Sequence, residues 1–183
     1  MKTPYLDILD EIDFSLKRIP ASEIYLPQKV SDKFNVYFGN IGWNEKAFIS
    51  KIYPAKTKQK HFLANYSKVF NSVLLNSTKF GLPNPDEIQK WYSQTPENFK
   101  FSFKIPHYIA HQRKIDDDEV LEDLIEFIDK VSILNDKLGM LQLGFSAGFK
   151  PERAPELYNL IKHLPEGVQL AVGLRNAKFF ENT

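Results

Sequence analysis

Short apolar runs alternate with amphipathic segments along most of this chain, and this alternation constrains its fold more than any other feature. Runs too short for helices predict β-strands at 36–40, 72–76, 101–105, 140–143 and 169–174. Apolar residues spaced three or four apart predict helices between them, at 62–70, 84–92, 116–131 and 157–164. Strands that alternate with helices form parallel βαβ units. The predicted fold class is therefore α/β.

Among α/β folds, the sequence favours a parallel β/α barrel of the TIM type over a nucleotide-binding fold. Gly39 and Gly42 are not followed by the glycine-rich turn into a helix that a dinucleotide or P-loop site needs. A complete eight-stranded barrel takes roughly 250 residues. With 183 residues and about five predicted strands, we expect an incomplete barrel of about five βα units. Its last strand would have an unpaired edge, so we expect self-association through that edge.

Residues 1–33 are predicted to be a partly helical extension that precedes the barrel domain at 34–183. Apolar residues at helical spacing mark the extension, and Pro20 ends the segment that carries them, Tyr5, Ile8, Leu9, Ile12 and Leu16. We interpret the extension as a strap that covers part of the body. A helix that binds a partner is the alternative.

Composition excludes several classes of function. Lys and Arg total 24 against 23 Asp and Glu, so the net charge of +1 creates no overall field for nucleic acid or an anionic membrane. Because Cys is absent, disulfides, thiolate metal sites and a cysteine nucleophile are excluded. The acidic start lacks the apolar run of a signal peptide, and no stretch approaches the ~20 apolar residues of a membrane span. We therefore expect a cytoplasmic protein with no membrane partner.

Polar residues fall at or just after most of the predicted strand ends, as Asn40, Asn76, Lys104, Gln142 and Arg175. In parallel β/α folds the carboxyl ends of the strands carry the site, because the loops there converge on one rim. Solvent contact at strand ends is the competing explanation. With His111 and Arg113 from the loop after the third strand, Lys104 and Arg175 would form a positive rim. Such a rim suits a phosphate, sulfate or carboxylate.

Two further features are open to more than one interpretation. Trp43 follows Gly42 and could be a stacking platform for a sugar or base, or a packed loop anchor. His107 and His111 are four residues apart, a spacing that places two metal ligands on one helix face. Because both follow Pro106 at a strand end, we do not expect helical geometry there, and we predict no metal site.

Several segments in order resemble the domain of unknown function 72 family, also called YecE-like. The likeness runs from about Asn35 to Phe180. It is carried by Tyr37-Phe38-Gly39 with Gly42-Trp43, Phe70–Val73 with Asn76–Phe80, Trp91, Thr95–Phe101, Lys104-Ile105-Pro106 with His111, Gln142-Leu143, Leu164–Gly167, and Ala171-Val172 with Arg175. The resemblance implies a TIM-type barrel of unestablished activity. It also implies that the rim is lined by Trp43, Asn76, Lys104, His111, Gln142 and Arg175.

The sequence departs from that family pattern at two places near the expected rim. Gly173 stands where the family usually has a Glu two residues before the Arg of its fifth strand. The segment 144–148 replaces the usual Pro-Pro turn after the fourth strand. By this resemblance, the family's last three βα units also have no counterpart among the predicted strands.

Three functions follow as hypotheses: a barrel that binds a small anionic, phosphorylated ligand, a nucleic-acid-binding or end-processing barrel, and a non-catalytic truncated remnant. The sequence assigns no reaction, substrate or cofactor.

Overall fold

The computed structural model describes residues 35–76 and 84–181 of the chain. The chain divides into two compact units, residues 1–35 and 36–183. The predicted helix at 5–16 lies outside the described residues, which belong to the second unit apart from Asn35.

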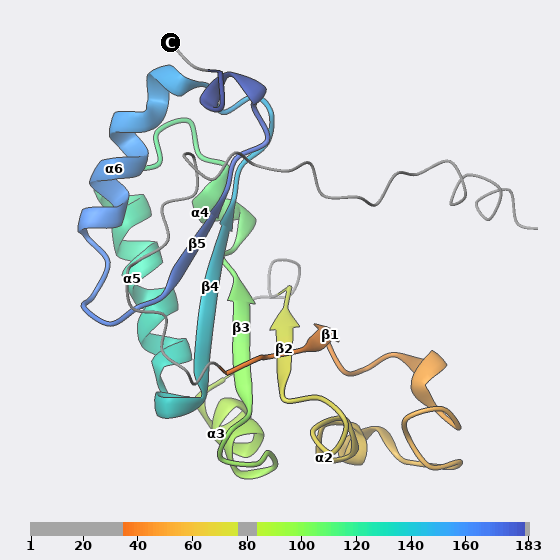
Figure 1. The fold of residues 1–183 in the computed structure, drawn as a ribbon. Coiled ribbons are helices and arrows are strands. Elements are labelled where there is room, and N and C mark those ends of the chain that lie inside the picture. Colours follow the sequence, from red (N-terminus) through yellow and green to blue (C-terminus); the bar gives the residue numbers. More distant parts are fainter. Residues whose placement is uncertain (1–34, 77–83, 182–183) are drawn as a thin grey trace, which may run out of the picture. The chain divides into compact units, whose positions relative to one another are not determined.

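Five strands form one parallel sheet in the order β1-β2-β3-β4-β5 (Figure 1). Their bounds are Gly39–Ile41 for β1, Ser72–Leu75 for β2, Lys100–Lys104 for β3, Leu138–Gly144 for β4 and Leu170–Gly173 for β5. Successive parallel strands that lie side by side in chain order are the arrangement found in a β/α barrel. The five predicted strands and their parallel direction are confirmed.

The α-helices between the strands are α2 (Phe62–Tyr66), α3 (Pro85–Ser93), α4 (His107–Ala110), α5 (Asp118–Ser132) and α6 (Ala154–Lys162). Single 3₁₀ turns lie at Lys46–Phe48 (η2), Gln59–His61 (η3), Asn135–Lys137 (η5), Pro151–Arg153 (η6) and Ala177–Phe179 (η7). The start of α3 follows local chemistry, because the Asn84 side chain accepts a hydrogen bond from the Glu87 amide at 2.9 Å. Pro85, which has no amide hydrogen to leave unpaired, occupies the first helical position.

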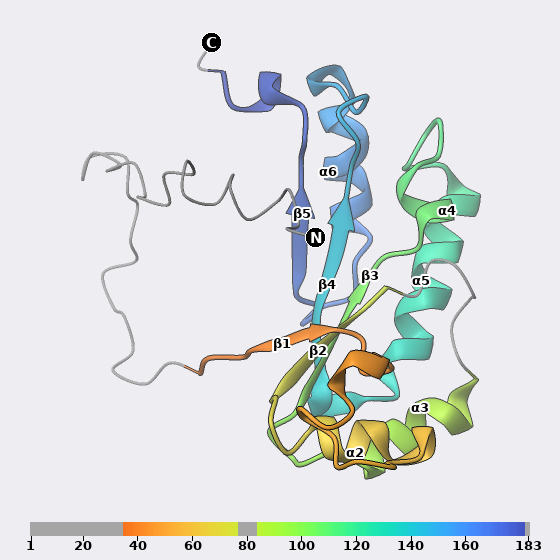
Figure 2. The same cartoon turned by 90° about the vertical axis from the view of Figure 1, so that its right-hand side faces the viewer.

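The two faces of the sheet differ in what covers them. Helices α4, α5 and α6 lie on the same side of the strands (Figures 1 and 2). On this helix face, four side chains from β3 and β4 are completely buried: Phe101, Phe103, Leu141 and Leu143. They pack with the buried stripe of α5, which includes Leu124 and Ile128. The hydrophobic core of the described part therefore lies between the sheet and its helices.

The opposite side, which we call the hollow face, carries the alternate residues of the same strands. A hollow of about 330 Å³ lies on it, lined by Gly39, Asn40, Ile41, Ser72, Val73, Leu74, Ser102, Met140, Gln142 and Ala171. Ser102 and Lys104 are half-buried, and Met140 and Gln142 are exposed. Because side chains alternate along a strand, the polar residues and the buried ones come from neighbouring positions.

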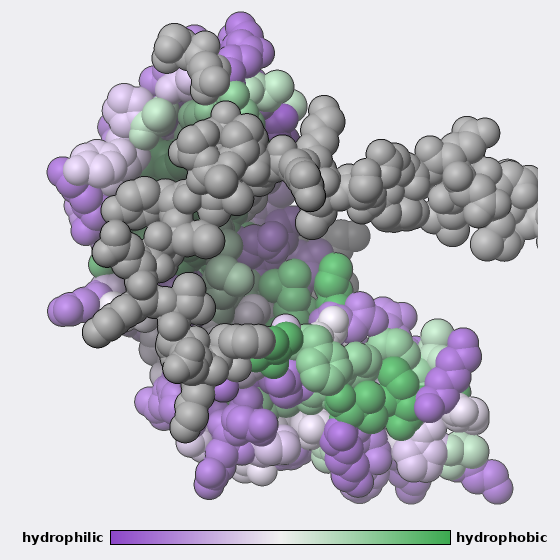
Figure 3. All heavy atoms as spheres, viewed as in Figure 1, coloured by the Kyte–Doolittle hydropathy of each residue, from purple (hydrophilic) through white to green (hydrophobic). Residues whose placement is uncertain are grey.

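The first strand is attached to the sheet partly through side chains. The buried Tyr66 hydroxyl of α2 accepts a hydrogen bond from the Asn40 amide at 2.6 Å and donates one to the Ser72 carbonyl at 3.0 Å. Before β1, the Asn71 side chain bonds Phe38 N and Val36 O, each at 2.8 Å. Hydrophobic residues gather around β1 on the surface shown in Figure 3. The edge of the sheet at β1 is thus apolar, and the side chains of Tyr66 and Asn71 hold it in place.

None of the helices within 35–76 and 84–181 combines the length and apolar character that a membrane span needs.

Candidate functional site

The parallel register brings polar residues of neighbouring strands to the same level. Lys104, the last residue of β3, pairs with Gln142 of β4, and the Ile105 amide donates to the Gln142 carbonyl at 2.9 Å. Asn76 directly follows Leu75, which pairs with Phe103, so Asn76 comes beside Lys104. On the other side, Gly173 of β5 pairs with Gly144, and Arg175 lies two residues beyond it. We call these carboxyl ends of β2 to β5 the rim.

A short helix after β3 adds two histidines to the rim. β3 ends at Lys104, and Pro106, whose backbone is extended, is the N-cap directly before α4. The His107 and His111 rings then lie one above the other, with centroids 3.7 Å apart and planes tilted by 30°. The expectation that this segment is not helical was therefore wrong, because a proline that precedes the first helical residue breaks none of the hydrogen bonds that it would break further inside.

Three basic side chains, Lys104, His107 and His111, lie close together in this cluster. Burial lowers the pKa of His111 below its ordinary value of 6.5, and the nearby His107 and Lys104 lower it further. A proton on His111 would thus lie close to the His107 ring and the Lys104 ammonium. Within the described residues, no group of three or more His, Asp or Glu side chains is arranged to hold a metal ion. The arrangement suits an anion better than a cation.

Of the remaining predicted site residues, Arg113 lies away from the rim, and Arg175 lies at its β5 end. Arg113 lines a separate hollow with the acidic side chains Asp117, Glu119 and Asp123 at the start of α5. Arg175 is exposed just beyond β5.

Trp43 packs into the helix-face core instead of facing the rim. Only 8% of its surface is exposed, and its ring meets those of Trp91 and Phe101 edge-on, at 5.0 and 6.2 Å between centroids. This packing agrees with the loop-anchor interpretation of Trp43.

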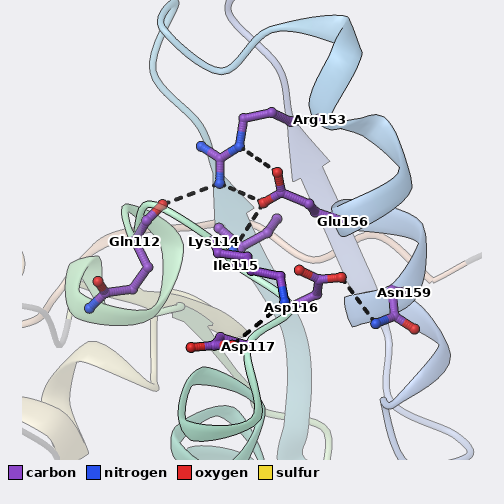
Figure 4. A network of polar contacts seen from close by, with 8 residues as sticks. All are labelled: Gln112, Lys114, Ile115, Asp116, Asp117, Arg153, Glu156 and Asn159. Carbon is purple, nitrogen blue, oxygen red and sulfur yellow. Dashed lines mark hydrogen bonds and ion pairs between the residues drawn. The ribbon is translucent and has the colours of Figure 1, made fainter.

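A polar network fixes the loop that leads from α4 to α5 (Figure 4). Arg153 binds Glu156 through two hydrogen bonds of 2.9 and 2.7 Å and also donates to the Gln112 carbonyl at 3.2 Å. Glu156 accepts the Ile115 amide at 3.1 Å, and Asn159 donates to Asp116 at 3.1 Å. The hydrogen bond from Arg153 is the main cause that lowers the pKa of Glu156. The loop that follows His111 is therefore anchored to the start of α6.

The sequence pattern alone reveals only part of this network. The Arg153–Glu156 pair is visible as a three-residue spacing on a helix. Its partner Ile115 is 41 residues away, and only the folded chain brings it close.

At Gly173, the position where the family resemblance places a Glu, the structure has space. A Cβ atom built there would meet its nearest neighbours, Gly144 Cα and Leu143 O, at the ordinary contact distances of 3.8 and 3.9 Å. The fifth strand therefore brings no carboxylate to the rim, although a side chain would fit.

The known proteins to which this chain is similar belong to one family. The family model described as "Protein of unknown function DUF72" matches residues 37–183. The UPF0759 protein YecE of Escherichia coli (strain K12) is 34% identical over 119 residues, which are 64% of this chain and 43% of that protein. The UPF0759 protein YunF of Bacillus subtilis (strain 168) is 27% identical over 150 residues, 79% of this chain and 52% of that one. The chain spans about half the length of these relatives.

Solved structures of similar fold carry the same family description. A DUF72 family protein from Thermotoga maritima MSB8 superposes with a TM-score of 0.64 at 23% identity, covering 80% of this chain and 58% of that one. A DUF72 family protein from Enterococcus faecalis V583 gives a TM-score of 0.61 at 19% identity, with 79% and 52% covered. At these identities, the likeness shows a shared fold.

Proposed function

Since the chain belongs to the DUF72 family, a family of unknown function, we propose from its own residues that the rim binds a small anionic ligand of the phosphate-ester class. The observation that carries the proposal is the cluster of Lys104, His107 and His111 at the end of β3. An anion placed against these three groups would offset the burial and the nearby positive charge that lower the pKa of His111. Arg and Lys side chains are the usual partners of phosphate oxygens.

The neighbouring residues supply hydrogen bonds in addition to charge. Asn76 and Gln142 flank Lys104 in the register and carry amide groups that can donate to phosphate oxygens. Arg175, beyond the end of β5, can approach from the other side with its planar guanidinium. Gly173 contributes no negative charge that would oppose an anion.

The hollow below the rim has room for the rest of such a ligand. Its volume of about 330 Å³ lies at the small end of the range for ligand sites, about 300–1,000 Å³. It is lined by polar groups such as Ser102 and Gln142 and by apolar ones such as Leu74 and Met140. This mixture suits a short sugar phosphate better than a long nucleic-acid strand, and the net charge of +1 favours the same choice.

Sulfate titration at several pH values tests this proposal. Sulfate is a suitable probe because its own charge does not change between about pH 5 and 8, whereas that of phosphate does. In the free protein the pKa of His111 lies below 6.5, and a bound anion would raise it by favouring the charged form. We therefore expect sulfate affinity, measured by isothermal titration calorimetry, to rise as the pH falls from the raised His111 pKa of the complex to the lower His111 pKa of the free protein, and to be constant outside this range.

Variants separate the rim from general charge effects. Lys104→Met should weaken sulfate binding by about tenfold, because one charge-assisted contact is lost. His111→Asn should remove most of the pH dependence, whereas His163→Asn, at the far end of α6, should leave it unchanged. If neither sulfate, phosphate nor glycerol phosphate releases heat with the folded protein, the ligand proposal is wrong and the remnant hypothesis is favoured.

A further inference from the structure

A second hollow lies between the loop after β1, the segment that leads into α2, and the helix α3. Its volume is about 560 Å³, larger than that of the hollow below the rim. We call it the tryptophan hollow, after two of the residues that form it: Trp43, Asn44, Gln59, Lys60, Trp91 and Gln94. Helices α2 and α3 lie at the same end of the sheet in both ribbon views (Figures 1 and 2).

Both tryptophans of the chain line this hollow. Their rings meet edge-on at 5.0 Å, and Trp91 also stacks on the buried Phe101, with the planes 17° apart. Trp43 is almost fully buried, whereas Trp91 is only half-buried and presents part of its indole ring. The hollow therefore has a rigid aromatic floor whose position is set by the core.

Hydrogen bonds hold the two walls in place without a ligand. On one side, the Tyr53 hydroxyl donates to the Trp43 carbonyl at 2.5 Å, and burial raises the pKa of Tyr53 to about 12, so the donor stays protonated. On the other side, the buried Lys137 ammonium donates to the carbonyls of Tyr92 and Thr95 at the end of α3, both at 2.6 Å. The site is thus preformed, which lowers the entropic cost of binding.

The charges around the hollow balance. Lys60 and Lys90 line it together with Asp86 and Glu87, so the site has no net charge to select an anion or a cation. The other polar lining groups are side-chain amides, including those of Asn44, Gln59 and Gln94. Amides offer a donor and an acceptor each, as do carbohydrate hydroxyls.

We propose that the tryptophan hollow binds a neutral carbohydrate, with the exposed part of Trp91 against a sugar face and the amides of Asn44, Gln59 and Gln94 on its hydroxyls. An indole ring offers the apolar surface on which the C–H face of a sugar packs. The hollow is large enough for one or two sugar rings. The tryptophan hollow shares no lining residue with the hollow below the rim, so the two proposals stand or fall independently.

Tryptophan fluorescence of the full 183-residue chain is a direct test, because the chain has no tryptophan outside this hollow. We expect cellobiose, maltose or chitobiose to change the emission in a saturable way, and sulfate to leave it unchanged. No change in emission up to the solubility limit of all three disaccharides, with the circular dichroism of a folded protein, would overturn the proposal.

Two variants and a matched control complete the test. The double variant Gln59→Ala, Gln94→Ala should bind the responding sugar about tenfold more weakly, because it loses two hydrogen-bonding groups. Gln89→Ala changes an exposed glutamine of α3 that does not line the hollow and should bind like the unaltered protein. Equal affinity of the double variant and the control, measured by calorimetry, would exclude the hollow as the sugar site.

Discussion

On β3, Phe101 and Phe103 point to the helix face and are fully buried, whereas Ser102 and Lys104 lie between and after them on the hollow face and stay partly accessible. β4 repeats the contrast, with Leu141 and Leu143 on one face and Gln142 on the other. The same strands thus serve two purposes through side-chain alternation. Stability should reside in the helix face, and the hollow face should be free to vary with function.

The largest expected effect contrasts adjacent residues of β3. Phe103→Ala should lower the free energy of unfolding by about 3–5 kcal/mol, because it removes a buried aromatic ring and leaves a cavity. Ser102→Ala on the hollow face should change it by less than about 0.5 kcal/mol. Urea unfolding measures both. Should Phe103→Ala fail to fold, Phe103→Leu gives a smaller loss in the same direction, and equal losses at 102 and 103 would refute the contrast.

We expect the two glycines at opposite edges of the sheet, Gly39 in β1 and Gly173 in β5, to differ in how well they tolerate a larger side chain. A Cβ atom added at Gly39 would lie 1.8 Å from the Ser72 carbonyl oxygen, so Gly39→Ala should cost about 1–3 kcal/mol by forcing β1 away from β2. Gly173→Ala meets only ordinary contacts and should stabilise the fold by about 0.4–1 kcal/mol. Thermal unfolding of the two variants checks the sign of each change. A loss at Gly173 as large as that at Gly39 would contradict this explanation.

The smallest expected effect concerns the polar network that Glu156 forms with Arg153 and the Ile115 amide. Glu156→Gln weakens the bonds to Arg153 and the Ile115 amide and should cost about 1 kcal/mol at pH 7. Because the folded-state pKa of Glu156 lies below its ordinary value of 4.5, its stabilisation is present above that pH and is lost as the pH falls through the folded value. Unfolding curves of the two proteins should therefore converge in acid. A difference that persists unchanged at low pH would mean that charge has no part in it.

The sequence predicted most of the fold, because strand and helix periodicity are local properties. It predicted the first strand too early, at 36–40 instead of Gly39–Ile41. The backbone groups of Phe38 and Val36 bond the side chain of Asn71, a long-range contact that apolar patterning does not reveal. The helix after β3 was missed because Pro106 was taken as a barrier to helical structure and not as a helix start.

The candidate sites were predictable to different degrees. Asn76, Lys104 and Gln142 are aligned by the register of parallel strands, which follows once the strands are identified. The contact between Trp43 and Trp91 joins residues that are far apart in the sequence, so the second hollow could not be anticipated. The stacking of His107 on His111 required the unexpected helical turn.

The Tyr66 hydroxyl of α2 bridges Asn40 of β1 and Ser72 of β2. The edge strand β1 is therefore held by a helix as well as by the neighbouring strand. A sheet edge normally opens by breaking backbone bonds one after another. Here, displacement of α2 would withdraw one hydroxyl and release both strands from it together. Asn40 lines the hollow below the rim, so any force that moves α2 changes the wall of that hollow as well. The molecule therefore has a mechanical link between α2 and the wall of the hollow on the open face of its sheet.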